Sequence, residues 1–102
     1  MGYSAYQLNI FAMNQQKVAI NRQMMAIQDE RDIYSTQYDK IVNSNTEWYK
    51  DPNVKYLQAR EDALDNELGK LETQLKDIEK NLESLEKGRD ENIKNGIPSL
   101  AS

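Results

Sequence analysis

The residues of this chain that could do chemistry are its carboxylates, which gather at residues 29–32 (Asp-Glu-Arg-Asp) and 61–62 (Glu-Asp). Two neighbouring carboxylates can serve as a general acid and a general base. Here acids and bases alternate at helical spacing, which is typical of a solvated helix face. The chain contains no His and no Cys, which excludes the commonest general base, thiol nucleophiles, disulfides and most zinc sites. We therefore expect no enzyme, no catalytic or metal-binding residues and no cofactor.

The charge of the chain is acidic overall but unevenly distributed. Net charge at neutral pH is −4, yet residues 1–28 carry only Lys17 and Arg22, whereas residues 29–102 carry 11 bases and 17 acids. Because no basic stripe is present to neutralise phosphates, we expect no nucleic-acid partner. No apolar run approaches the roughly 20 residues of a membrane span, and no signal peptide opens the sequence. We expect a soluble protein whose export, if any, follows a leaderless route.

Residues 52–95 carry the pattern of one long helix. Apolar residues there fall at spacings of four and three, which is a heptad seam with one narrow buried stripe. Most of the remaining positions carry charged or other polar residues, so the rest of this helix is expected to face water. The predicted seam residues of this helix are Leu57, Leu64, Leu68, Leu71, Leu75, Ile78, Leu82 and Leu85.

A second heptad series predicts another helix over residues 4–42. Lys17 and Arg31 interrupt its apolar seam at positions where buried polar groups can fix register and partner number. Alternatively, both side chains extend past the seam into water. The predicted seam residues of this first helix are Tyr6, Ile10, Met13, Ile20, Met24, Ile27, Tyr34, Tyr38 and Ile41.

The two helices are separated by a predicted turn over residues 43–51, which is rich in Asn, Ser and Thr. Asp51 is a good N-cap and Pro52 suits the first position of the second helix. A Gly-Ile-Pro sequence opens a predicted tail over 96–102. Because a short turn makes the helices antiparallel neighbours, the predicted fold class is all-α, an antiparallel two-helix hairpin or coiled coil forming one domain over 1–102.

The length of the turn predicts which residues face each other across the hairpin. If the chain reverses near its only tryptophan, facing residue numbers add to roughly 97. Lys17 is then expected close to Glu79 and Glu83, and Arg31 close to Glu67.

The first helix has apolar residues outside its seam. Phe11, Val18 and Met25 recur every seven residues, and Ala12 and Ala19 belong to a neighbouring alanine column. Amides rather than charges lie between these columns, so the helix has several faces suited to contact. One hairpin provides only one neighbouring helix, which favours oligomerisation. The alternative is that these residues merely fill a moderately amphipathic helix.

The turn contains the largest apolar pair of the chain, Trp48 and Tyr49. Both residue types are favoured anchors of protein interfaces, so the pair is a candidate contact with a second subunit or another partner. In the alternative, one ring folds back over Ile41, Val42 or Tyr56 and closes the last layer of the seam, as a hydrophobic staple does.

The segment Asp-Pro-Asn-Val-Lys-Tyr-Leu-Gln at 51–58 resembles the junction of type III secretion needle subunits. In that family an Asp-Pro or Asn-Pro in the loop precedes a helix with Leu and Gln at similar spacing. The resemblance implies a short, leaderless helical hairpin that stacks with copies of itself into a hollow filament. A second loop proline and a hydrophobic tail, both common in the family, are missing here.

Two further resemblances concern the general layout. An amide-rich first helix followed by a heptad second helix is similar to the terminal coiled-coil region of flagellin-like axial proteins. The secreted Trp-x-Gly hairpins of type VII systems are also acidic chains with tryptophan in the turn. In this chain Tyr49 and Lys50 follow Trp48, so the glycine of that motif is absent.

These observations lead to a structural rather than a catalytic hypothesis. We expect a self-assembling subunit of a bacterial filament or tubular assembly, exported without a cleaved signal to the cell surface or the medium. Its partners would be copies of itself, together with an export machine or chaperone. The alternatives are a cytoplasmic coiled-coil adaptor or export chaperone that binds one partner protein through the first helix, and a secreted effector-like hairpin that does not assemble.

Overall fold

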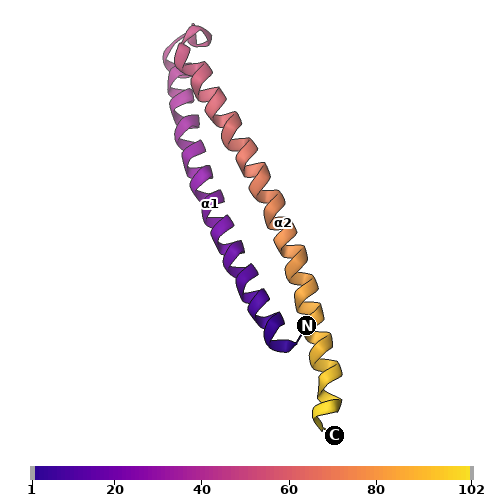
Figure 1. Ribbon diagram of the computed structural model, residues 1–102. Coiled ribbons are helices and arrows are strands. Elements are labelled where there is room, and N and C mark those ends of the chain that lie inside the picture. The colour runs from indigo at the N-terminus through magenta and orange to yellow at the C-terminus, as the bar shows by residue number, and fades with distance from the viewer. Residues whose placement is uncertain (1, 102) are drawn as a thin grey trace. The chain divides into compact units, whose positions relative to one another are not determined.

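The computed structural model of the chain describes the secondary structure of residues 2–101 and the side chains of residues 2–95. Helix α1 (Tyr3–Ser44) is followed by a short 3-10 helix, η1 (Trp48–Lys50), and by helix α2 (Pro52–Ala101). Figure 1 shows α1 from indigo to magenta and α2 from red to yellow. The predicted all-α, antiparallel two-helix hairpin is confirmed. Helix α2 continues to Ala101, where the sequence predicted a tail over 96–102, and the side chains of that segment lie outside the described part of the chain.

The turn is built by short polar side chains that bind the backbone. The Ser44 hydroxyl donates to the carbonyl of Ile41 at 3.3 Å, which keeps Ser44 in α1. The carboxamide oxygen of Asn45 accepts the backbone N–H of Glu47 at 2.9 Å, which opens the turn. The sequence predicted that this helix ends at residue 42, whereas α1 ends at Ser44. The hydrogen bond of Asn45 replaces a helical one, so α1 ends before this residue.

The start of α2 is capped as the sequence predicted. An oxygen of the Asp51 carboxylate accepts the backbone N–H of Asn53 at 2.9 Å. The backbone of Asp51 is extended (φ −69°, ψ 122°), and Pro52 is the first helical residue. The cap satisfies one of the free N–H groups of the first turn, while proline removes another.

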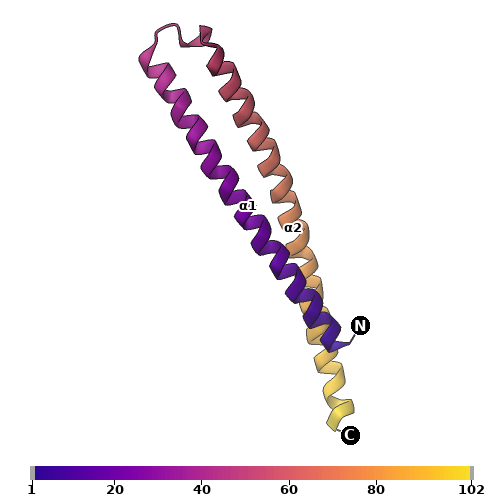
Figure 2. The same cartoon turned by 60° about the vertical axis from the view of Figure 1, so that its left-hand side comes forward.

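Packing divides the chain into two compact units. We call Asn21–Glu72 the turn unit, and Met1–Ile20 together with Thr73–Ser102 the terminal unit. Within each unit a segment of α1 packs against a segment of α2. The two helical segments of the turn unit lie side by side in both Figure 1 and Figure 2.

Ion pairs between the helices show which residues face each other within each unit. In the terminal unit Lys17 pairs with Glu79 at 3.7 Å, as expected from the sequence. In the turn unit Arg31 pairs with Asp65 at 3.1 Å, whereas the sequence placed it near Glu67. The predicted sum of roughly 97 places position 66 opposite Arg31, so Asp65 and Glu67 both lie next to the facing position, and the ion pair forms with Asp65.

Candidate functional site

The residues predicted for the seam all lie on the sides of α1 and α2 that pack together. Ten apolar side chains of the described structure are at most 9% exposed, and the remaining predicted seam residues are half-buried. The ten are Ile10, Ile20, Ile27, Val54, Leu57, Leu64, Leu68, Leu71, Ile78 and Leu82. The half-buried ones are Tyr6, Met13, Met24, Tyr34, Tyr38, Ile41, Leu75 and Leu85.

Sequence reasoning missed two members of this seam. Val54 is 3% exposed, and Glu61 is half-buried with a buried carboxylate oxygen that has no hydrogen-bond partner within the described residues. Leu68, Leu75 and Leu82 form a column with a spacing of seven residues, and Glu61 and Val54 continue it toward the start of α2 with the same spacing. The signal was therefore present in the heptad pattern, although only Val54 matches it in residue type.

The two basic residues of the α1 seam reach past it to carboxylates of α2. The side chain of Lys17 is 39% exposed and that of Arg31 is 47% exposed, as is that of its partner Asp65. Ion pairs at such exposure contribute about 0–1 kcal/mol each. They therefore help to select the register and contribute little to its stability.

A second polar cluster of the turn unit was not anticipated from the sequence. Arg60 on α2 donates to the Glu30 carboxylate at 2.9 Å, and the Tyr34 hydroxyl donates to the same carboxylate at 3.3 Å. The Arg60 guanidinium carbon also lies 5.6 Å from the centre of the Tyr34 ring. Hydrogen bonding with the Tyr34 hydroxyl, which has the largest effect, and with the Glu30 carboxylate raises the pKa of Arg60. An arginine guanidinium is charged throughout the physiological pH range, so this shift does not change its protonation state there.

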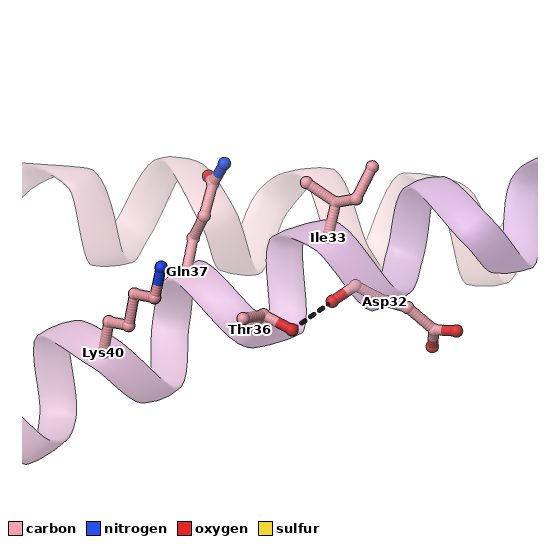
Figure 3. Close-up of a pocket in the computed structure, with 5 residues that line it drawn as sticks. All are labelled: Asp32, Ile33, Thr36, Gln37 and Lys40. Carbon is pink, nitrogen blue, oxygen red and sulfur yellow. Dashed lines mark hydrogen bonds between the residues drawn. The ribbon is translucent and has the colours of Figure 1, made fainter.

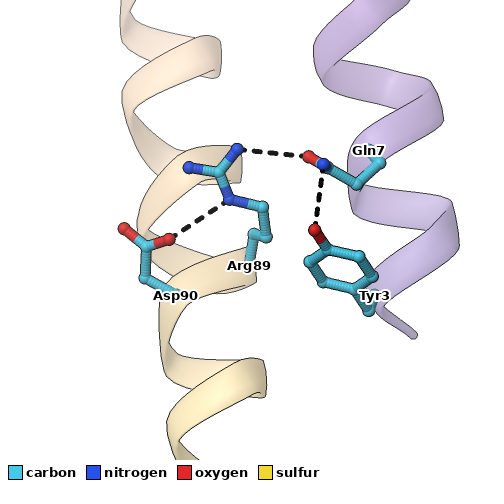
Figure 4. A network of polar contacts seen from close by, with 4 residues as sticks. All are labelled: Tyr3, Gln7, Arg89 and Asp90. Carbon is cyan, nitrogen blue, oxygen red and sulfur yellow. Dashed lines mark hydrogen bonds and ion pairs between the residues drawn. The ribbon is translucent and has the colours of Figure 1, made fainter.

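The terminal unit has its own polar cluster between the helices, shown in Figure 4. Arg89 on α2 donates to the Gln7 carboxamide oxygen at 3.1 Å, and the Gln7 nitrogen donates to the Tyr3 hydroxyl at 3.1 Å. The Tyr6 ring lies directly over Gly88, where a Cβ atom would be 2.7 Å from ring carbon Cε1. Gly88 thus permits a close approach of the two helices.

At the turn, Trp48 packs within its own chain. Its ring is edge-on to Tyr38 of α1, with centroids 6.1 Å apart, and edge-on to Tyr49, with centroids 6.0 Å apart. Tyr56 was one of the residues that the sequence suggested as a neighbour of the folded-back ring, but its side chain is 58% exposed. The aromatic neighbour on α1 is instead Tyr38, one turn before Ile41. Tyr49 remains 58% exposed and is the ring of the pair that faces outward.

Five of the residues predicted for contacts with other subunits are exposed on α1. In the terminal unit Phe11 is 63% exposed and Val18 is 45% exposed, and in the turn unit Met25 is 64% exposed. Ala12 and Ala19 are exposed as well. Two residues that the sequence analysis did not single out share this exposure: Leu8 (71%) and Ile33 (57%). Without implying how the two units are placed relative to each other, we call these seven residues the outer face of α1.

A shallow, open hollow lies on the turn-unit part of α1, lined by residues 32, 33, 36, 37 and 40. Figure 3 shows these side chains on successive turns of a single helix. The Thr36 hydroxyl in its wall donates to the backbone carbonyl of Asp32 at 2.9 Å and so faces its own helix. A hollow on one helix surface provides no converging polar groups to hold a small molecule.

The described residues contain no group of three or more acidic side chains placed to hold a metal ion. In the same part of the chain, neither helix has a segment long and apolar enough to cross a membrane. Comparison of the chain with models of known protein families, with curated proteins and with solved structures finds no match. Within the described structure, the distinctive arrangement of side chains is the outer face of α1.

Proposed function

We propose that the chain is a structural subunit that associates with copies of itself into a filament or tubular assembly, using the outer face of α1. The observation that carries this proposal is the exposure of Phe11, Val18 and Met25, which recur every seven residues along one side of the helix. Large apolar side chains that are scattered singly need no explanation, but a repeated set on one helix face is typical of a contact surface.

Burial of this face would stabilise an assembly substantially. Covering one large apolar side chain contributes about 1.5–3 kcal/mol when burial is complete. Phe11, Met25 and Leu8 are each more than 60% exposed, so most of that contribution is still available to a second molecule. Association has an entropic cost of its own, which is why several such side chains are required rather than one.

The polar residues around this face also suit contact between copies. Residues 1–28 contain only Lys17 and Arg22 as charged groups, and Lys17 already pairs with Glu79. The neighbouring positions are largely Asn and Gln, whose amides both donate and accept hydrogen bonds. Two copies of such a surface can therefore come together without strong repulsion between like charges.

The filament and the leaderless export rest on the resemblance of residues 51–58 to the needle-subunit junction. They form part of the same proposal, which places the assembly on the surface of a bacterial cell. An adaptor that binds one foreign protein is the competing outcome of the tests, because it would use the same exposed side chains.

Electron microscopy and light scattering of the purified chain test the proposal. We expect particles whose mass grows with concentration, and Phe11→Ser should reduce that growth at least tenfold. Tyr56→Ser is the matched control, because Tyr56 is exposed to a similar extent (58%) but lies on α2. A monodisperse monomer at high concentration would overturn the proposal, and a foreign chain that copurifies at equal stoichiometry would favour the adaptor.

A further inference from the structure

The turn-unit part of the outer face of α1 carries a charge pattern that complements itself. Arg22 and Asp29 are both exposed, and Met25, 64% exposed, lies between them on the same side of the helix. The two charged residues are seven positions apart, or about 10 Å along the axis, which is too far for a pair within one helix. None of the ion pairs in the described part of the chain involves either of them.

The order of these charges decides which arrangement of two α1 helices is favourable. In a parallel, in-register contact Arg22 would face Arg22 and Asp29 would face Asp29, and facing like charges are unfavourable. In an antiparallel contact centred between Met25 and Ala26, each Arg22 faces the Asp29 of the other copy. That arrangement forms two opposite-charge pairs and places the two Met25 side chains against each other.

We propose that two copies of this chain associate through an antiparallel contact between their α1 helices, centred on Met25 and Ala26, with Arg22 of each copy facing Asp29 of the other. The inference rests on the proposed self-assembly and names the partner surface. The partner surface is α1 rather than α2, because Tyr56 is the only large apolar side chain that α2 exposes within the described turn unit. Such a contact is two-fold symmetric and closes on itself.

Apolar burial and charge have separate roles in this contact. Met25 and Ile33, 64% and 57% exposed, supply the apolar surface that drives association. Exposed ion pairs are individually weak, so the Arg22–Asp29 pairs set the orientation. Two such pairs correspond to about a tenfold change in the dissociation constant. A two-fold contact alone makes a dimer, and growth into a filament requires a second surface elsewhere on the chain.

Charge reversal tests the facing of Arg22 and Asp29. In a dimer of the Arg22→Glu variant an acid faces an acid at each pair, and in a dimer of the Asp29→Arg variant a base faces a base. Each variant alone should therefore dimerise at least tenfold more weakly in sedimentation equilibrium. A mixture of the two variants should restore association, because each acid then meets a base. Lys55→Glu, the same charge change at an exposed position of α2, is the control and should leave association unchanged.

Cysteine crosslinking tests the direction of the helices, since the chain has no cysteine of its own. Under mild oxidation Met25→Cys should form a covalent dimer, because position 25 lies beside the two-fold axis. Ile33→Cys should not, because an antiparallel contact separates the two copies of position 33 by about 20 Å along the axis. Crosslinking at both positions would indicate a parallel contact and overturn the inference.

The outcomes separate this inference from the proposal on which it rests. If the wild-type chain is a monomer at all concentrations, both are wrong. If it assembles but the mixture of charge variants gains nothing over either variant alone, the antiparallel contact is wrong and self-assembly stands through another surface. Restored association in the mixture, together with a Met25→Cys dimer, supports both.

Discussion

The two helices bury the same kind of apolar stripe but present different surfaces to water. Tyr3, Leu8, Phe11, Val18, Met25 and Ile33 are exposed on α1, whereas Tyr56 and Ile93 are the only large apolar side chains exposed on α2 within the described residues. A helix with a single neighbour needs a single apolar stripe. The difference indicates that α2 is adapted to one neighbour, while α1 has apolar surface left over after α2 is packed against it.

Two leucines provide the strongest test of this comparison. Leu64 of α2 is 3% exposed and Leu8 of α1 is 71% exposed. Leu64→Ala removes buried contacts and should lower the free energy of unfolding by about 2–4 kcal/mol. Leu8→Ala should change it by less than about 0.5 kcal/mol. Urea unfolding followed by circular dichroism, at concentrations low enough to avoid association, measures both.

The comparison would fail if both substitutions were equally costly. An equal loss at Leu8 would mean that the outer face of α1 is covered within a single chain, so it would no longer be available to a second copy. Concentrated samples provide a further check, because Leu8→Ala should weaken association there while Leu64→Ala loses helicity at every concentration.

Periodicity predicted the helices and the seam, because the same four-and-three spacing that places residues on one side of a helix also buries them. It predicted the outer column at Phe11 but not Leu8 and Ile33, which lie beside that column and outside its seven-residue repeat. The pairing of Arg60 with Glu30 was missed for another reason. Long side chains reach across several positions, so their partners depend on rotamers and on the register of the turn.

The aromatic pair of the turn gives the next largest expected effect. Trp48 is half-buried and edge-on to Tyr38, whereas Tyr49 is 58% exposed. Trp48→Ala should lower the free energy of unfolding by about 2 kcal/mol, through lost burial and one lost aromatic contact. Tyr49→Ala should leave it within about 0.5 kcal/mol. Thermal unfolding measures both, and a larger loss at Tyr49 would contradict the intrachain role of Trp48.

The two helices also begin differently. Asp51, the residue before α2, caps that helix through its bond to the N–H of Asn53, whereas the residue before α1 is Gly2, which has no side chain to act as a cap. Asp51→Ala should cost about 1 kcal/mol, since one N–H of the first turn loses its acceptor. Asp51→Asn keeps an acceptor and should cost much less, and urea titrations distinguish the two variants. Equal losses would show that charge, rather than the cap hydrogen bond, stabilises the start of α2.

The smallest expected effect separates two glycines of α2. Around Gly69 a Cβ atom would meet nothing within 4 Å, whereas at Gly88 it would lie 2.7 Å from the Tyr6 ring of α1. Gly69→Ala should stabilise the chain by up to about 1 kcal/mol, because alanine favours the helix. Gly88→Ala gains the same helix propensity but displaces the Tyr6 ring, so we expect little or no net gain.

A double substitution isolates that displacement. In a Tyr6→Ala background the ring is gone, so Gly88→Ala should then stabilise the chain as much as Gly69→Ala does, and the difference between backgrounds is the coupling energy of the pair. The same gain at Gly88 in both backgrounds would mean that Tyr6 does not lie over this glycine in solution. Because Tyr6 belongs to the seam of α1, its displacement would alter the face that meets α2 and leave the outer face of α1 unchanged.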